Sequence, residues 1–392
     1  MNKIEPLFRP GGKLAKLESV YDGMESFLFT PNTTSRSGVH IHDGNDLKRT
    51  MITVVVALMP ALLFGMYNIG YQHYIASGAN STGWFTMWLY GLLAMLPVIV
   101  VSYAVGLGIE FISAQIHHKE IQEGFLVTGI LIPLIVPINT PLWMTAVATA
   151  FAVIFAKEVF GGTGMNIFNV ALIARAFLFF AYPSKMSGDA VFVKTDSIFG
   201  LGGTAPDGFT CATPLSQVAT NVGDQLQNPI SCLDAFIGFI PGSPGETSMI
   251  AILIGAAILL LTGVASWRIM CSVFVGGLGM AALVHGFATP TYPASMLNPL
   301  TQLCLGGFAF GAVFMATDPV TGARTKTGQY IYGLLIGIFA ILIRVYNSGY
   351  PEGMMLAILL MNAFAPLIDH CVVSSNIKRR ARRAAVKEKK EG

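Results

Sequence analysis

Long apolar segments separated by short polar or Gly/Pro-rich loops fill the chain from about residue 51 to residue 372. A helix needs about 20 apolar residues to cross the hydrocarbon core of a bilayer, and the loop residues divide this region into about ten such segments. Two of them are short, because Pro137 and Pro141 split one apolar run into halves. The pattern predicts an all-α polytopic membrane protein with spans at 51–74, 87–112, 125–138, 141–157, 165–183, 249–266, 269–288, 300–317, 330–346 and 354–372.

The composition excludes a soluble protein. Hydrophobic residues make up 53% of the 392 residues and charged residues only 11%, whereas soluble domains carry about 25% charged residues. We therefore expect membrane lipid around the chain and no nucleic acid among its partners. The first 50 residues are polar and lack the apolar run of a signal peptide.

The positions of Lys and Arg predict the orientation, because cytoplasmic loops carry an excess of these residues. Both terminal segments are basic, so both termini are predicted to be cytoplasmic and the number of spans to be even. Counting spans from the inside then places the long loop at 184–248 outside. The other predicted outer loops, at 75–86, 289–299 and 347–353, carry no Lys or Arg, and the predicted inner loops are 115–124, 157–164, 267–268 and 318–329.

Ten spans with one long loop after the fifth suggest two repeats of five helices. A repeat with an odd number of spans and both termini inside must be inverted, as in many transport folds. The predicted organisation is a cytoplasmic N-terminal segment (1–50), a first repeat (51–183), an extracytoplasmic loop (184–248), a second repeat (249–372) and a basic cytoplasmic tail (373–392). The N-terminal segment has two interpretations, a tail at the lipid headgroups or a lid over a cytoplasmic-side site.

Charged residues within or next to the spans are candidates for function, because burying them in a membrane is costly. Arg175 lies too deep to reach water and needs a carboxylate, a cluster of carbonyls or an anionic ligand. Glu110 follows Gly106, and its carboxylate either reaches the interface or contacts a quinone head or an ion. Asp318 and Asp369 end two spans, where they either cap and pair or belong to a cation path.

Aromatic residues follow Arg175 in the same span. Phe177, Phe179 and Phe180 either pack against helices and lipid or line a flavin or quinone pocket. Five cysteines without a C-x-x-C spacing give no indication of an iron–sulfur or zinc site, so no tightly bound metal is predicted. Cys211 and Cys232 share the outer loop, either as a disulfide or as two separate thiols.

The outer loop contains the sequence Asp207-Gly208-Phe209-Thr210-Cys211-Ala212-Thr213. Asp-Gly followed by hydroxyl residues is typical of a solvated turn. The stretch also resembles the D-G-x-(S/T)-G-A-T signature, at which a flavin transferase attaches FMN through its phosphate to the last threonine. In this chain that threonine is Thr213.

Over nearly its full length the chain resembles the NqrB/RnfD family, whose members belong to the sodium-translocating NADH:quinone oxidoreductase (Nqr) and to the related Rnf complex. Residues 1–50 favour the Nqr type, because the Rnf member generally lacks such an extension. The matching stretches are Asp46–Arg49, Glu123–Phe125, Lys157–Gly164, Arg175–Phe177, Asp207–Thr213, Met315–Pro319 and Tyr350–Met355.

The resemblance implies a redox subunit of an inner-membrane complex of bacteria. It implies covalent FMN on Thr213, a noncovalent riboflavin, quinone as electron acceptor and sodium as the exported ion. The implied partners are the other subunits of a six-subunit complex and a flavin transferase. A non-redox transporter with an inverted repeat is the competing interpretation of the same helices.

The resemblance also assigns roles to single residues. Asp207, Gly208, Thr210, Ala212 and Arg175 are implied around the flavin, Gly106, Glu110, Phe177 and Phe179 around quinone, and Asp318, Asp369 and Glu110 along the sodium path.

Two residues depart from the family pattern. Cys211 stands where the flavin signature has glycine, which changes the backbone freedom of the loop. Val170 replaces an expected proline and makes the start of its helix less fixed without abolishing it.

Overall fold

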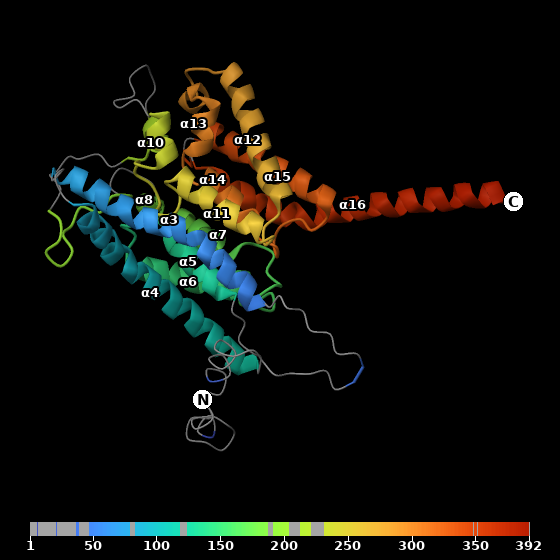
Figure 1. Ribbon diagram of the computed structural model, residues 1–392, viewed down its shortest axis with the longest axis horizontal. Coiled ribbons are helices and arrows are strands. Elements are labelled where there is room, and N and C mark those ends of the chain that lie inside the picture. Colours follow the sequence, from blue (N-terminus) through green and yellow to red (C-terminus); the bar gives the residue numbers. More distant parts are fainter. Residues whose placement is uncertain are drawn as a thin grey trace.

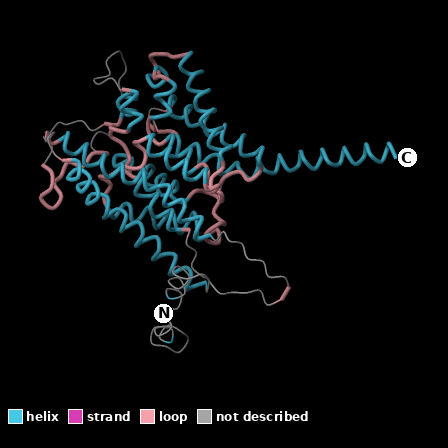
Figure 2. The backbone as a smooth tube through the Cα atoms, viewed as in Figure 1, coloured by secondary structure: helices cyan, strands magenta, loops and turns pink. Residues whose placement is uncertain are grey.

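The computed structural model describes residues 47–78, 83–117, 124–186, 191–203, 212–220, 231–347, 349–350 and 352–391, with the isolated residues 6, 21, 37 and 38. Its regular structure is helical (Figures 1 and 2), and apart from one bridge between Ile198 and Leu201 the described part contains no β-pairing. The fold is therefore the all-α polytopic membrane fold that the hydropathy pattern predicts.

The first half of the chain forms five main helices, α3 to α7. Their bounds follow the predicted spans, and the apolar run split by proline becomes two short helices. The helices are α3 (Leu47–Ala76), α4 (Trp84–His117), α5 (Phe125–Ile135), α6 (Leu142–Ala152) with its π-helical continuation η2 (Val153–Glu158), and α7 (Val170–Ala181), followed by the short α8 (Pro183–Met186).

Two short helices in the outer loop, α9 (Pro214–Thr220) and α10 (Cys232–Ile237), connect to the second half. There the predicted span at 300–317 is a broken helix, with residues 305–307 between its two pieces. The elements are α11 (Met249–Leu261), α12 (Trp267–Gly286), the 3-10 turn η3 (Pro293–Met296), α13 (Pro299–Cys304), α14 (Phe308–Phe310) with the π segment η4 (Gly311–Met315), α15 (Lys326–Tyr346) and α16 (Met354–Glu391).

Five of these helices (α3, α4, α12, α15 and α16) are long and apolar enough to cross a membrane, and α5, α7 and α11 are shorter apolar helices. Many large apolar side chains on the long helices point away from the protein interior, among them Val100, Ile112 and Val275. A helix that is apolar on every side is typical of a membrane span. The number of complete crossings, ten, remains a prediction.

Close backbone contact joins α12 to α15 in the second half. A Cβ atom at Gly276 would lie 2.4 Å from the Leu334 carbonyl oxygen, and one at Gly337 would lie 2.2 Å from the Val273 carbonyl oxygen. Only glycine leaves room for this approach, which maximises dispersion contacts where lipid removes the usual hydrophobic driving force. Glycine therefore fixes this helix pair.

Helices α7 and α16 exchange polar contacts at their N-terminal ends. Arg175 of α7 pairs with Glu352, which lies just before α16. Conversely, Asn362 of α16 accepts a hydrogen bond at 3.2 Å from the backbone N–H of Asn169, just before α7, in the amide orientation that satisfies its neighbours. Such reciprocal contacts are expected of two helices related by a two-fold axis, although the inverted repeat itself remains a prediction.

Helix α16 continues from the last predicted span into the basic tail without a break (Figure 1). The sequence separates the span at residue 372 from the tail, but the structure makes both parts of one helix that projects from the bundle.

Candidate functional site

Two cavities lie at opposite ends of the apolar bundle. The Asp318 cavity, about 110 Å³ in volume, is lined by the starts of α3, α5 and α7 and by the ends of η2, α11 and η4. The Thr213 cavity, about 20 Å³, is lined by residues 213–215, 240–243, 246, 247, 306 and 352. Segments that the charge pattern predicts to face the cytoplasm meet at the first cavity, and segments predicted to face outward meet at the second.

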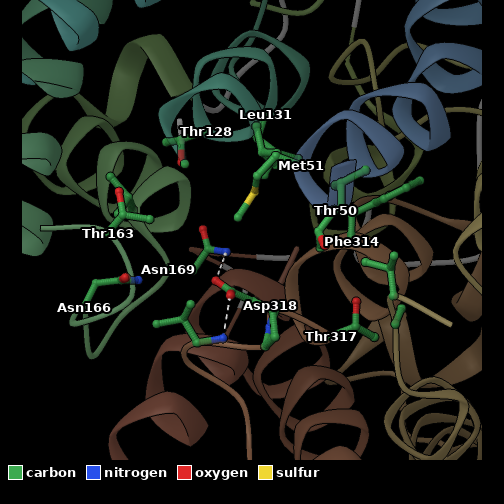
Figure 3. Close-up of a pocket in the computed structure, with 18 of the residues that line it drawn as sticks. Thr50, Met51, Thr128, Leu131, Thr163, Asn166, Asn169, Phe314, Thr317 and Asp318 are labelled. Carbon is green, nitrogen blue, oxygen red and sulfur yellow. Dashed lines mark hydrogen bonds between the residues drawn. The ribbon is translucent and has the colours of Figure 1, made fainter. Parts of the chain in front are cut away.

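The carboxylate of Asp318 is the charged group at the centre of the larger cavity (Figure 3). It accepts hydrogen bonds from the Asn169 side-chain amide at 3.2 Å and from the Val320 backbone N–H at 3.0 Å. Asn169 also caps α7 by accepting from the Leu172 N–H, so the helix starts at Val170 without the expected proline. Burial raises the pKa of the Asp318 carboxyl above its usual range, and these hydrogen bonds oppose the increase.

Hydroxyl and amide side chains surround this carboxylate. Together with Asp318 they offer hard oxygen ligands, which suit a cation such as sodium. Figure 3 shows the threonine side chains gathered from α3, α5 and the loops before α7 and after η4; the polar lining residues are Thr50, Thr128, Thr163, Asn166, Asn169 and Thr317.

Both π-helical segments lead into this cavity. η2 carries Lys157, and η4 ends three residues before Asp318. π segments are rare and often occur at functional sites, because the wider turn redirects the side chains that follow. The sequence pattern gave no indication of either segment.

Glu110 and Lys157 form a buried ion pair beside the Asp318 cavity. The Lys157 ammonium also lies 5.8 Å from the centre of the Phe125 ring. The edge of that ring lies against Gly106, one turn before Glu110. The structure thus brings the predicted pair Gly106 and Glu110 together with Lys157, and Glu110 is paired rather than exposed at the interface.

Replacing Gly106 with alanine will lower the thermal stability of the purified complex. The new Cβ would meet the Phe125 ring at 1.8 Å, and that ring is completely buried and has little room to move. Overpacking of this kind costs about 1–3 kcal/mol, more than the roughly 1 kcal/mol that alanine gains over glycine in a helix. A melting curve in detergent measures the difference.

Gly108→Ala is the matched control, because a Cβ at Gly108 meets nothing within 4 Å on the same helix. We expect its melting temperature to equal or exceed that of the wild type. Equal destabilisation by the two variants would contradict the packing argument.

Arg175 forms the second buried charge cluster, at the end of the bundle near Thr213. Its guanidinium pairs with the carboxylates of Glu246 and Glu352. Both partners also line the Thr213 cavity. The carboxylate that a deep arginine needs is therefore supplied twice, once from the loop before α11 and once from the loop before α16.

Arg344 of α15 lies next to this cluster and is almost completely buried. It donates hydrogen bonds to the backbone carbonyls of Gln302, Leu305 (3.0 Å) and Glu352 (3.4 Å). The break between α13 and α14 exposes two of these carbonyls, so the arginine satisfies the open end of a broken helix.

Thr213 lies just before α9 and is partly exposed. Its carbonyl accepts from the Gln217 N–H at 2.9 Å, and its side-chain oxygen accepts from the Ser216 N–H at 3.2 Å. The neighbouring Ala212 is buried, and its carbonyl accepts from the Gln217 side chain at 2.8 Å. These contacts hold the threonine at a fixed position over the Thr213 cavity.

The aromatic candidates lie elsewhere. Phe177 stacks on Phe151 with ring centres 4.7 Å apart, and Phe179 contacts the edge of Tyr350 at 4.3 Å. Phe177 follows Asn169 by eight residues, about 12 Å along a helix. The structure thus places Phe177 and Phe179 toward the Thr213 end and Glu110 at the Asp318 end.

Asp369 is occupied by the protein itself. Its carboxylate accepts from the backbone N–H groups of Arg324 (2.8 Å) and Thr325 (3.0 Å) and from the Thr325 hydroxyl (2.6 Å). These contacts attach the loop before α15 to α16, so a cation at Asp369 would have to compete with three donors.

Several predicted features lie outside the described residues. These include most of the N-terminal segment 1–50 and Asp207, Gly208, Thr210 and Cys211, so the proposed disulfide between Cys211 and Cys232 remains untested. Conversely, the sequence analysis did not select Glu246, Glu352 or Arg344. The charge of Arg344 within a predicted span was the signal that could have identified it.

These features define an α-helical membrane protein with buried ion pairs and a polar cavity at each end. A family model described as the NQR2, RnfD, RnfE family matches residues 34–378, and the chain belongs to this family. It is 45% identical to the NqrB protein of Chromohalobacter salexigens, which is named as one of the subunits of the Na(+)-translocating NADH-quinone reductase, over 98% of this chain and 96% of that protein. The proteins of the same name from Klebsiella pneumoniae and Ectopseudomonas mendocina are also 45% identical, over 98% of each chain.

Proposed function

We propose that this chain is the flavin-carrying membrane subunit of a sodium-translocating NADH:quinone reductase. The observation that supports this most directly is Thr213, the last residue of a flavin-attachment signature, held in a partly exposed position over a buried charge cluster. The full-length similarity to proteins named as the same subunit of such enzymes supports this function too. The other subunits of the six-subunit complex would supply the electrons.

The surroundings of Thr213 fit an FMN attached through its phosphate. The residue is partly exposed, so a flavin transferase can reach its hydroxyl, and its backbone is fixed by the first turn of α9. The flavin would accept electrons and pass them on. The protein's part is to hold the attachment point beside Arg175 and Arg344, whose positive charges favour a nearby phosphate.

The orientation follows from the charge pattern. We propose that the Asp318 end faces the cytoplasm, the Thr213 end faces outward, and both termini are cytoplasmic in a bacterial inner membrane. The two predicted sets of loops meet at the two different cavities, which supports one consistent orientation. The FMN would then be outside and tethered, so it could not diffuse away.

Quinone and riboflavin belong to the proposal in different degrees. Gly106 and Glu110 offer a polar contact at the cytoplasmic end, while Phe177 and Phe179 lie toward the other end. The Asp318 cavity, about 110 Å³, is smaller than the roughly 300 Å³ of typical small-molecule sites. A riboflavin does not fit it, and we assign that cofactor no residues.

Sodium is the ligand that the Asp318 cavity suits best, since a small cation needs a carboxylate and neutral oxygens but little volume. Replacing Asp318 with asparagine will raise the sodium concentration for half-maximal turnover at least about tenfold, the effect of losing roughly 1.4 kcal/mol of binding. Glu158→Gln is the control, since Glu158 accepts from Ser113 and does not line the cavity. An unchanged sodium dependence in Asp318→Asn would contradict the assignment.

The same carboxylate predicts a pH effect. Its pKa is raised by burial, so it binds a proton at a higher pH than an ordinary aspartate, and the folded state loses stability as pH rises through that pKa. Sodium needs the ionised form. Acidification will therefore weaken sodium activation in the wild type, and the Asp318→Asn variant will show less of this pH dependence.

Mass spectrometry of the peptide that contains Thr213 tests the proposed function. The chain is expressed with its partner subunits and a flavin transferase, purified and digested. A peptide carrying FMN on Thr213 is the expected result. An unmodified peptide from an active complex would overturn the attachment site, and an inactive complex without flavin would favour the non-redox transporter.

The Rnf-type protein is the second candidate within the family. The N-terminal segment favours the Nqr type, and the relatives named above carry the name of the Na(+)-translocating NADH-quinone reductase. Electron transfer from NADH to quinone by the purified complex distinguishes it from an Rnf-type complex, which exchanges electrons with ferredoxin.

A further inference from the structure

We propose that the Thr213 cavity is a binding site for one monovalent cation, held by Glu246, Glu352 and Thr247. The inference rests on the proposed function for the identity of the ion, sodium, and for the charge on Thr213, but the site itself follows from the geometry below. It lies at the opposite end of the bundle from Asp318.

The Thr247 hydroxyl is the first observation. Thr247 lines the cavity and is 2% exposed, and its side-chain oxygen has no hydrogen-bond partner among the described residues. Leaving a buried hydroxyl unpaired is costly, so such groups usually contact water, an ion or a ligand. A cation in the cavity would give this oxygen its partner.

The size and the donors of the cavity fit a single small ion. Its volume of about 20 Å³ has room for roughly one water-sized species. Glu246 and Glu352 supply carboxylate oxygens, and Thr247 and Ser243 supply hydroxyl oxygens. Oxygen ligands of this kind suit hard cations such as sodium.

Two interruptions of the helical bundle create the site. The loop that carries Glu246 is attached to the end of α5, because Ser243 donates to the Ile135 carbonyl at 3.1 Å and the Gly245 N–H donates to the Leu134 carbonyl at 2.8 Å. On the other side the break between α13 and α14 lies so close that a Cβ at Gly307 would meet the Glu246 carboxylate at 2.5 Å. Ion sites in membrane transporters are commonly built at such discontinuous helices.

The charges favour a monovalent ion. Glu246 and Glu352 carry two negative charges, and Arg175 and Arg344 carry two positive charges, so these four side chains are neutral together. A phosphodiester on Thr213 would add one negative charge next to them. One monovalent cation restores neutrality, whereas a divalent cation would exceed it.

Equilibrium binding of radioactive sodium to the purified complex tests this site, with covalent flavin measured by gel fluorescence on the same samples. Thr247→Val replaces the unpartnered hydroxyl with a methyl group of similar size. We expect it to weaken one sodium site about tenfold, with the folded complex and its flavin intact. Glu352→Gln is expected to abolish that site, and Asp234→Asn, an exposed carboxylate on α10, is expected to change nothing.

An unchanged sodium isotherm in Thr247→Val overturns the inference, and it means that the cavity holds water only. If Glu352→Gln does not assemble, Thr247→Val alone decides, because removing an unpaired hydroxyl leaves the protein's own hydrogen bonds intact. A wild type without covalent flavin that still loses the sodium site in Thr247→Val would refute the flavin proposal and retain the cation site.

Discussion

Replacing Thr213 with alanine will abolish covalent flavin in this chain. The phosphoester needs the side-chain oxygen of this residue, and alanine has none, so the expected loss is complete rather than partial. The fold should tolerate the change, because the lost contact is one hydrogen bond from the Ser216 N–H at the start of a seven-residue helix. Losing a cap of this kind costs about 1 kcal/mol. In-gel flavin fluorescence of the denatured chain measures the result.

Ser216→Ala is the matched control, since it removes a hydroxyl three residues away in the same turn. The wild type and this variant should fluoresce equally when each is expressed with the flavin transferase. A fluorescent Thr213→Ala band would mean that the flavin is attached elsewhere. A dark wild-type band would indicate that Cys211 disables the signature, since glycine stands there in the family pattern.

Hydropathy alone predicts the helices well, because each span must satisfy its own backbone hydrogen bonds in lipid. The predicted start of the last span at residue 354 is the observed start of α16, and the predicted split at Pro137 and Pro141 separates α5 from α6. The break at residues 305–307 was not predicted. It lies in an apolar stretch, where hydropathy does not distinguish a continuous helix from an interrupted one.

The site is only partly predictable from the sequence. The depth of Arg175 within its span correctly indicates that it needs a counter-charge, but not which one, because Glu246 and Glu352 are 71 and 177 residues away. Both glutamates lie in loops, where a carboxylate is unremarkable until the fold buries it. Pairing across such distances depends on tertiary packing, which no local pattern contains.

The functional assignments divide in the same way. The resemblance names Glu110 and Asp318 without their partners, and the structure adds Lys157 to the first and Asn169 to the second. Asp369 shows the opposite case, since its oxygens are used to attach the loop before α15. A sequence match identifies an acidic position, but only the contacts around it distinguish a ligand from a structural cap.

Replacing Arg175 with methionine will strongly destabilise the folded subunit. Methionine fills a similar space but leaves Glu246 and Glu352 buried without their counter-charge. Removing one partner of a buried ion pair costs about 3–5 kcal/mol, because the remaining charge has lost both water and its partner. We expect a much lower yield of assembled complex on size exclusion and a clear drop in melting temperature.

The triple variant Arg175→Met, Glu246→Gln, Glu352→Gln separates charge from packing. Replacing all members of a buried ionic cluster with neutral residues is often nearly neutral for stability, so most of the lost stability should return. Arg324→Met is the control for loss of a positive charge, because Arg324 is exposed and only its backbone N–H bonds to Asp369. If the triple variant is as unstable as Arg175→Met, the arginine acts through its shape and packing rather than its charge. The same triple variant lacks both carboxylates of the Thr213 cavity, so its recovered fold should come without the sodium site that those carboxylates provide.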